Sequence, residues 1–228
     1  MSEVCLLMGG DAESKCGSLT VTSVLLLTHF PFGWCVFFLL VFCNMNCYPT
    51  PRRFLMKFGR IVAVCTSVQP GIPKVPQPFV RLGNYGLVND FHCTPMRRSF
   101  SKPGTMVTNN DRHITIVAKE VVDEINRELG VNVPIGGLGE NILVEGLGDL
   151  SYVKGENVCI GIGNVILGGY NIALRFVKQN QPCKNLAPYH PEYVKKIYGR
   201  RGLLCVIESG VGRTIEPGAS IRLFNGLA

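Results

Sequence analysis

Short runs of apolar and β-branched residues, separated by glycines, limit the possible folds of this chain more than any other feature. Residues of this kind favour strands, whereas glycine allows the positive φ angles that tight turns need. Glycine supplies 26 of the 228 residues. The predicted strands cover residues 59–65, 114–117, 141–145, 158–162, 172–177, 203–207 and 220–223.

Two segments carry a helical pattern instead. Residues 119–129 repeat apolar side chains on one helical face, and Gly130 is placed to end that helix. A shorter helix is predicted within residues 188–198. Many short strands with few helices indicate a mainly β fold, and we expect a barrel-like domain with two or more short helices.

The N-terminal part of the chain has a different composition. Residues 18–43 contain no Asp, Glu, Lys or Arg and are long enough to span a bilayer, which needs about 20 mostly apolar residues. Pro31 and Gly33 interrupt this stretch, so it predicts a kinked or marginal transmembrane helix at best. Basic residues follow it, and the positive-inside rule would then place the main domain in the cytosol.

We therefore divide the chain into an apolar N-terminal extension, residues 1–55, and a main domain, residues 56–228. Three interpretations of the extension stay open: a membrane anchor, an over-extended gene model whose natural start is Met56, and a targeting peptide. A membrane contact is expected only if residues 18–43 are real and retained.

Charge and cysteine usage narrow the function classes. Acidic and basic residues cancel in residues 1–55, so the formal net charge of +7 belongs to the main domain. This excess fits either an anionic ligand, such as a phosphorylated cofactor, or a solvated cationic surface. No basic stripe interleaves with aromatic residues, which argues against nucleic acid. The cysteines of the main domain lack regular spacing, which favours a reducing compartment over a disulfide framework.

Cys183 is the cysteine with the most suggestive setting. It lies in the run Gln181-Pro182-Cys183-Lys184, and no other cysteine is close in sequence. Such a lone thiol is a poor half of a zinc site. It fits a reactive thiol or a single thiolate ligand to a cofactor metal.

Three glycine-marked clusters could bind an anion. Backbone N–H groups in glycine turns can cradle a negative charge, and arginine matches phosphate as a fork of donors. Asn141 and either Arg200 or Arg201 could add side-chain donors. The alternative is that the clusters are simple turns between strands. They span residues 83–92, 136–142 and 198–202.

Taken in order, these motifs resemble the MOSC domains, which are homologous to the C-terminal part of molybdenum cofactor sulfurases. The resemblance covers about residues 57–224, and small stand-alone members are the most similar. Its motifs are Gly86-x3-Asp90-x-His92, Arg112-His113-Ile114-Thr115-Ile116, Gly137-Leu138-Gly139-Glu140-Asn141-Ile142, Pro182-Cys183-Lys184-Asn185-Leu186 and Gly199-Arg200-Arg201-Gly202-Leu203.

The resemblance implies a barrel-like β domain that binds a molybdopterin-type molybdenum cofactor or handles sulfur for it. In the amidoxime-reducing relatives one cysteine ligates molybdenum, and it corresponds to Cys183 here. The cofactor phosphate needs cationic donors, which Lys74, Arg200 and Arg201 could supply. In the strand that leads to Cys183, residues 168–173 look like an insertion and are expected to add a bulge or change the register.

Other residues in these motifs have two interpretations each. His92 fits a proton donor that faces the site, or a structural histidine after a turn. Asn110 fits pterin recognition or a turn. Asp90 is expected to lock its turn. Glu140 is expected to orient the glycine cluster at residues 136–142, called the glycine loop below. Asn141 stays a predicted cofactor contact.

Two functions follow from the resemblance. The first is an oxidoreductase that reduces N-hydroxylated small molecules at a cofactor molybdenum held by Cys183. It needs electrons from a separate flavin or haem reductase, because the chain shows no flavin or haem site. The second is a binding or sulfur-carrier module that holds a persulfide on Cys183 without turnover. Pyridoxal phosphate is linked to the family through fused sulfurase domains, but no such domain is evident in this chain.

Overall fold

A closed ring of seven strands forms the main body of the chain. The computed structural model describes residues 5–8, 21–27, 38–43, 56–98, 105–155, 158–166 and 169–225. Within it, hydrogen bonding runs in the order β10-β9-β13-β12-β11-β15-β4, and β4 pairs with β10 to complete the circle. The mainly β, barrel-like fold is therefore confirmed. The barrel strands are β4 (Met56–Thr66), β9 (Ile114–Ala118), β10 (Ile142–Glu145), β11 (Val158–Ile166), β12 (Gly169–Gln179), β13 (Leu203–Ser209) and β15 (Ser220–Asn225).

One pair in this ring runs parallel. Strands β9 and β10 are parallel, with Ile142 opposite Ile116, and the other barrel pairs are antiparallel. A parallel pair needs a long crossover, which α1 (Lys119–Leu129) provides. The predicted helix is confirmed, and Gly130 ends it in the left-handed conformation with φ of 63°.

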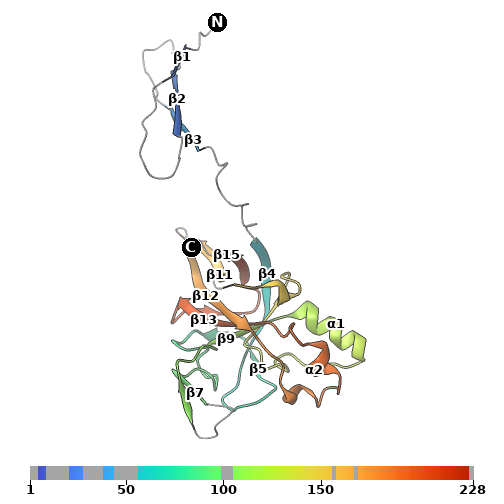
Figure 1. Cartoon of the computed structure of the whole chain (residues 1–228). Helices are drawn as coiled ribbons and strands as arrows, with labels where there is room; N and C mark the ends of the chain where they lie inside the picture. Colours follow the sequence, from blue (N-terminus) through green and yellow to red (C-terminus); the bar gives the residue numbers. More distant parts are fainter. Residues whose placement is uncertain are drawn as a thin grey trace. The chain divides into compact units, whose positions relative to one another are not determined.

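The core lies inside the barrel and under α1. Alternate residues of the strands point inward, as Ile114 and Ile116 do on β9. At the end of β9 the alternation stops, and Val117 and Ala118 are buried as well, beside the buried face of α1. The second predicted helix is found as α2 (Tyr193–Lys196), and Figure 1 shows it on the same side of the barrel as α1.

Gly202 lets β13 begin close to β9. Its φ is +98°, and a Cβ there would lie 2.0 Å from the carbonyl oxygen of Ile116. A larger residue would push the two strands apart exactly where Leu203 pairs with Ile116. This glycine belongs to the last predicted cluster, and its role here is strand packing.

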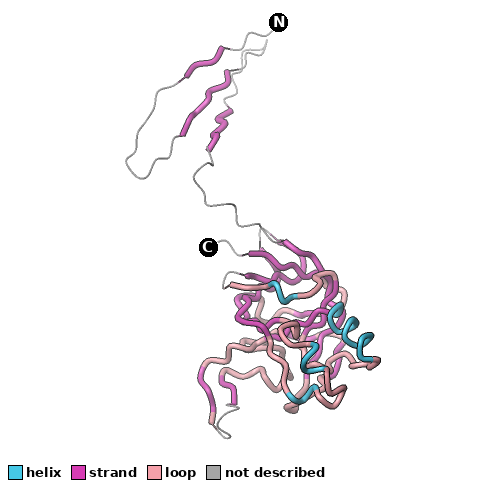
Figure 2. The backbone as a smooth tube through the Cα atoms, turned by 45° about the vertical axis from the view of Figure 1, so that its right-hand side comes forward, coloured by secondary structure: helices cyan, strands magenta, loops and turns pink. Residues whose placement is uncertain are grey.

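Short strands and single helical turns fill the connections between the barrel strands. Figure 2 shows these loops and short elements around the barrel. β6 pairs with β14, and β7 pairs with β8 in a separate hairpin. They are β5 (Val75–Gln77), β6 (Val80–Arg81), β7 (Met96–Arg98), β8 (Met106–Thr108), β14 (Thr214–Ile215), η1 (Leu150–Tyr152) and η2 (Lys184–Leu186).

The strand pairing on both sides of residues 168–173 is irregular, but the extra residues of the two nearest register shifts lie on the partner strands β11 and β13. The β11–β12 register shifts between Ile162 and Val165, at the end of the hairpin that contains this stretch. The β12–β13 register shifts between Ala173 and Leu174 and again between Phe176 and Lys178. The extra residue of β12 itself lies between Phe176 and Lys178, so the strand before Cys183 is bulged at that point, which re-aims the neighbouring side chains.

The N-terminal residues form a unit of their own. The chain divides into Met1–Arg53 and Phe54–Ala228. In the first unit β1 (Cys5–Met8), β2 (Val21–Leu27) and β3 (Phe38–Cys43) form an antiparallel sheet in that order.

The predicted transmembrane helix is not observed in this unit. The parts of residues 18–43 that are described are strands β2 and β3, in keeping with their many β-branched and aromatic residues. The rest of the stretch lies outside the described residues. Among the helices that are described, none combines the length and the apolar character that a membrane crossing requires.

Candidate functional site

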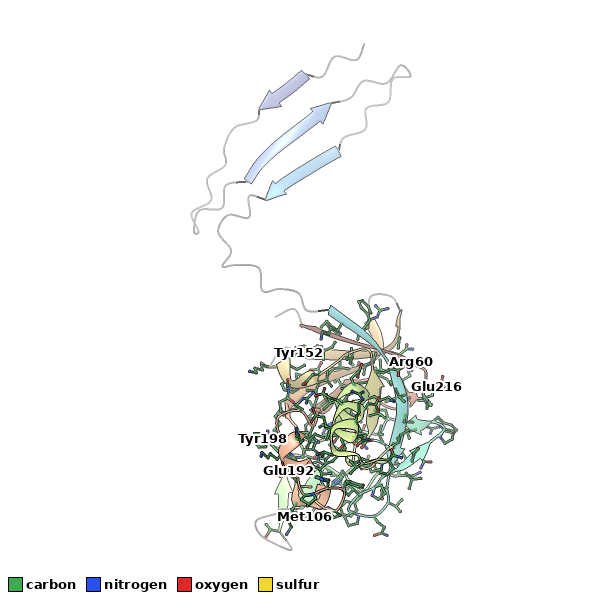
Figure 3. The ribbon with its side chains drawn as sticks, turned by 90° about the vertical axis from the view of Figure 1, so that its right-hand side faces the viewer. Arg60, Met106, Tyr152, Glu192, Tyr198 and Glu216 are labelled. Carbon is green, nitrogen blue, oxygen red and sulfur yellow. The ribbon has the colours of Figure 1, made fainter. Side chains whose placement is uncertain are left out.

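A cavity of about 1160 Å³ opens at one end of the barrel. Its wall includes Thr115 and Leu204, near the starts of β9 and β13, and Gln179, at the end of β12. Met106 of β8 also lines it, and Figure 3 draws Met106 and Tyr152 at opposite ends of the barrel domain. Six sequence-predicted residues line this cavity, namely Lys74, His92, Asn110, Asn141, Cys183 and Arg201.

Cys183 is the exposed thiol of this site. It immediately precedes η2, in an extended conformation, and its carbonyl oxygen accepts a hydrogen bond of 3.1 Å from the Leu186 backbone N–H. By contrast Cys65 and Cys205 are buried in the core. Burial raises the pKa of the Cys65 thiol to about 12, and it raises the pKa of Cys205 further. Cys183 is the thiol among these three that can reach a ligand.

Asp90 is the centre of a buried polar network beside the cavity. Its Oδ2 accepts hydrogen bonds from Lys74 Nζ at 2.8 Å and from Asn141 Nδ2 at 3.1 Å. Its Oδ1 accepts from the backbone N–H of His92 at 3.0 Å. Asp90 also accepts a longer bond, 3.4 Å, from the Ser67 N–H. The predicted turn lock therefore also joins three cavity-lining residues.

Lys74 is a buried cation with donors to spare. Its side chain is only 4% exposed, and burial lowers the pKa of its ammonium group, an effect that Asp90 opposes. Within the described residues Asp90 Oδ2 is the one acceptor of its three N–H groups. A buried ammonium in this state gains from a ligand that brings oxygen acceptors into the cavity.

The glycine loop is held by Glu140. The carboxylate accepts hydrogen bonds from the backbone N–H groups of Gly136, at 2.7 Å, and Leu138, at 3.1 Å. Burial raises the pKa of Glu140. Gly136 has φ of +83°, and a Cβ there would lie 2.0 Å from the carbonyl oxygen of Lys74. The predicted role of Glu140, to orient this loop, is confirmed, and the loop in turn fixes the backbone of Lys74.

Arg201 ties the glycine loop to the segment before Cys183. Its two terminal nitrogens donate to the carbonyl oxygens of Leu138, at 2.5 Å, and of Gln181, at 2.7 Å. The residue is 8% exposed, and its Nε is buried without an acceptor among the described residues. The guanidinium thus lies in the cavity wall, and its Nε–H is available to a ligand.

Arg200 lies away from this cavity. Its guanidinium donates to both carboxylate oxygens of Glu124, at 3.0 and 2.8 Å, and its Nε donates to Asp149 Oδ2 at 2.7 Å. These contacts link the turn before β13 to α1 and to the N-cap of η1. The structure does not bring Arg200 together with the other predicted site residues.

Replacing Arg200 with methionine is expected to give a pH-dependent loss of stability. Hydrogen bonds from Arg200 lower the pKa of Glu124 below its usual 4.5. A carboxylate with a depressed folded-state pKa stabilises the fold above its unfolded pKa and stops doing so as the pH falls. The difference in free energy of unfolding between wild type and Arg200→Met should therefore be full above pH 4.5 and shrink below it. Urea unfolding at pH 7 and pH 3.5 measures this, and a difference that grows in acid would contradict it.

Asn110 and His92 share one loop at the cavity. Asn110 Nδ2 donates to the carbonyl oxygens of His92, at 3.0 Å, and Thr94, at 2.9 Å, and its Oδ1 accepts from the Arg112 N–H. The amide is thus engaged with the backbone, as the turn interpretation expects. His92 as a residue is exposed, and it lines the cavity. Desolvation, and then the charge of Lys74, lower the pKa of His92.

Several cavity residues were not anticipated from the sequence. Lys178 lines the cavity and pairs with Asp111 Oδ2. The sequence did contain a signal for Lys178, because a lysine directly follows the predicted strand that leads to Cys183. Met96 and Met106 also line the cavity. Their strands have three residues each, too short for an alternating pattern to be recognised.

Comparison with known proteins agrees with this architecture. The YuaD protein from Bacillus subtilis matches with a TM-score of 0.63 and 22% identity, over 76% of this chain and 100% of that chain. YiiM from Geobacillus stearothermophilus matches with a TM-score of 0.48 and 21% identity, over 74% of this chain and 75% of that one. At 22% identity the likeness to YuaD shows the fold alone. Among proteins with curated descriptions, none matches this chain.

The sequence itself gives the family. A model of the MOSC domain matches residues 101–222, which is more than half of the chain. The matched region contains the glycine loop, Cys183 and Arg201, and thus a large part of the cavity wall. On this evidence the chain belongs to the MOSC domain family.

Proposed function

We propose that this protein binds a molybdopterin-type molybdenum cofactor in the barrel-end cavity and uses it to reduce N-hydroxylated small molecules. The MOSC family is associated with molybdenum cofactor binding. One observation carries the proposal for this chain: an exposed thiol, Cys183, shares a cavity with the buried cations Lys74 and Arg201.

The donor groups of the cavity fit such a cofactor. A molybdopterin-type cofactor presents an anionic phosphate and hydrogen-bonding ring edges. Arg201 Nε, buried without an acceptor within the described chain, and the spare N–H groups of Lys74 suit an oxygen-rich anion. A thiolate is a soft ligand, and Cys183 is exposed to take that role. Asn141 also lines this cavity.

Each of these residues would have a distinct part in the reaction. The bound cofactor supplies two-electron redox chemistry at its metal. Cys183 would hold the metal, while Lys74 and Arg201 would hold the anionic end. His92, which lines the cavity and whose pKa is lowered by desolvation, would exchange a proton with the substrate.

The overall reaction balances with an external electron donor. For a hydroxylamine it is R–NHOH + 2 e⁻ + 2 H⁺ → R–NH₂ + H₂O, in which the N–O bond breaks and new N–H and O–H bonds form. The electrons would come from a separate flavin or haem reductase. We place this reaction in the cytosol.

A sulfur-carrier role is the second candidate, and the exposure of Cys183 favours it as well. A persulfide on this thiol could be passed to an acceptor without turnover at a metal. Cyanolysis separates the two functions, because it releases thiocyanate from a persulfide. A carrier would give thiocyanate from wild type and none from Cys183→Ser, with cofactor affinity unchanged.

Molybdenum and pterin analysis of wild type beside Cys183→Ala tests the main proposal. Both proteins are loaded with cofactor and assayed for hydroxylamine reduction with an artificial electron donor. We expect wild type to hold both components. Cys183→Ala should lose at least about 100-fold in activity, because changing residues that only contact a metal ligand already costs roughly 10–100-fold.

Cys159→Ala is the matched control, because Cys159 lies on β11 and is not among the residues that line the cavity. It should keep the wild-type activity and metal content. A wild-type protein that stays metal-free and inactive after loading would refute the proposal, as would equal turnover by Cys183→Ala.

A further inference from the structure

The β7–β8 hairpin presents two methionines to the cavity from one face. In its register Met96 pairs with Thr108 and Arg98 pairs with Met106. Paired residues share a face, and so do residues two apart on one strand, so Met96 and Met106 lie on the same face. Both residues line the cavity. The hairpin therefore forms one wall of the site.

This wall is apolar and open. Met96 is 36% exposed and Met106 is 44% exposed, although both are large hydrophobic residues. Phe91, Ile72 and Leu204 add further apolar surface to the same cavity. Unbranched methionine side chains adapt to ligands of different shape, and they make favourable contacts with aromatic rings.

The cavity has room for a substrate beside a cofactor. Its volume, about 1160 Å³, exceeds the roughly 300–1,000 Å³ that a single small-molecule site usually occupies. Two of its cationic residues, Lys74 and Arg201, are buried and suited to an anion. Contact with an anion does not stabilise an exposed methionine side chain. Contact with an apolar group does, because it removes apolar surface from water.

We infer that the β7–β8 hairpin is the specificity-determining wall for the substrate, and that it selects N-hydroxylated compounds with an apolar, preferably aromatic, substituent. This inference rests on the proposed reductase function for its chemistry. The wall itself rests only on the register, exposure and position of Met96 and Met106.

Two substrates that differ only in the apolar group test the inference. N-phenylhydroxylamine carries a phenyl ring, and hydroxylamine has none. For Met106→Gln, which keeps the side-chain length and adds polarity, KM for N-phenylhydroxylamine should rise roughly five- to tenfold. The kcat for this substrate and both constants for hydroxylamine should stay unchanged. Met106→Leu should restore the wild-type KM, and Met96→Gln should act in the same direction as Met106→Gln.

A binding measurement separates this inference from the proposed function. Aniline, the product, is titrated into wild type and the Met96→Gln/Met106→Gln double variant, with calorimetry as the readout and without any turnover. Weaker binding by the double variant supports the wall even if wild type proves inactive as a reductase. Equal aniline affinity in both proteins overturns it, as does a KM change of the same size for both substrates. An unchanged urea midpoint confirms that the variants are folded.

Discussion

Replacing Asp90 with alanine is expected to lower the free energy of unfolding by about 3–5 kcal/mol, the usual cost of breaking a buried ion pair from one side. The substitution leaves the Lys74 ammonium buried without its counter-ion. It also removes one of the two acceptors of Asn141 Nδ2, the other being the Cys65 carbonyl oxygen, and it removes the acceptor of the His92 N–H. Urea unfolding at pH 7 measures the loss.

The loss should depend on pH in a defined direction. Asp90 raises the pKa of Lys74 against the effect of burial, so its removal lowers that pKa further. A buried lysine with a depressed pKa destabilises the folded state while it is charged. This free-energy cost falls as the pH rises and the group loses its proton. The deficit of Asp90→Ala should therefore narrow between pH 7 and pH 9. Other charged or titratable groups that act on Lys74 are Glu140, Cys65 and His92, and all are kept in the variant.

Two matched variants make this result specific. Asp90→Asn keeps the shape and an acceptor oxygen but removes the charge, so it should fall between wild type and alanine. Asp123 pairs with Lys119 on the surface of α1, and Asp123→Ala should cost less than about 1 kcal/mol. If Asp90→Ala proved no more harmful than Asp123→Ala, the central role of Asp90 would be wrong.

Replacing Arg201 with methionine is expected to disorder the segment from Gln181 to Cys183 and to reduce cofactor retention at least about tenfold. Changing residues that support metal ligands typically costs about 10–100-fold in metal affinity. Arg201 joins the carbonyl oxygens of Leu138 and Gln181, so it fixes the glycine loop relative to the residues just before Cys183. Arg201→Lys should not rescue the protein, because an ammonium lacks the planar fork that reaches two acceptors. Molybdenum and pterin content after loading is the readout.

Arg200 supplies the control for this experiment, because it is the adjacent residue with the same side chain. Arg200→Met should keep the cofactor at pH 7, since its contacts are with Glu124 and Asp149 outside the cavity. Cofactor lost from Arg200→Met but kept by Arg201→Met would reverse the assignment made from the structure.

The sequence predicted the barrel because its elements have local signals. The helix at residues 119–129 shows an apolar face and a terminal glycine, and both features are present in the structure. The predicted strands all appear in the barrel, in several cases a few residues longer. The order of strands around the ring could not be predicted this way, since it depends on pairings between residues far apart in the chain.

The divergence of Arg200 and Arg201 shows why the site was predicted only in part. Both arginines belong to the same motif, and the guanidinium group of either could bind an anion. In the structure Arg200 contacts Glu124 and Asp149, whereas Arg201 contacts two backbone carbonyl oxygens at the cavity. Nothing local to the pair reveals which of the two side chains faces the cavity. Asn110 is similar: its residue type suits a ligand contact, but the backbone groups of its own loop engage its amide.

The closure of the ring also sets the order in which the protein can be completed. β4, the first barrel strand in the chain, pairs with β15, the last, while β15 also pairs with β11. Until β15 has left the ribosome, β4 and β11 each keep an open edge of unpaired N–H and C=O groups, the kind of edge that promotes association between chains. The barrel can therefore close only after β15 has been made, when this strand pairs with the open edges of both β4 and β11.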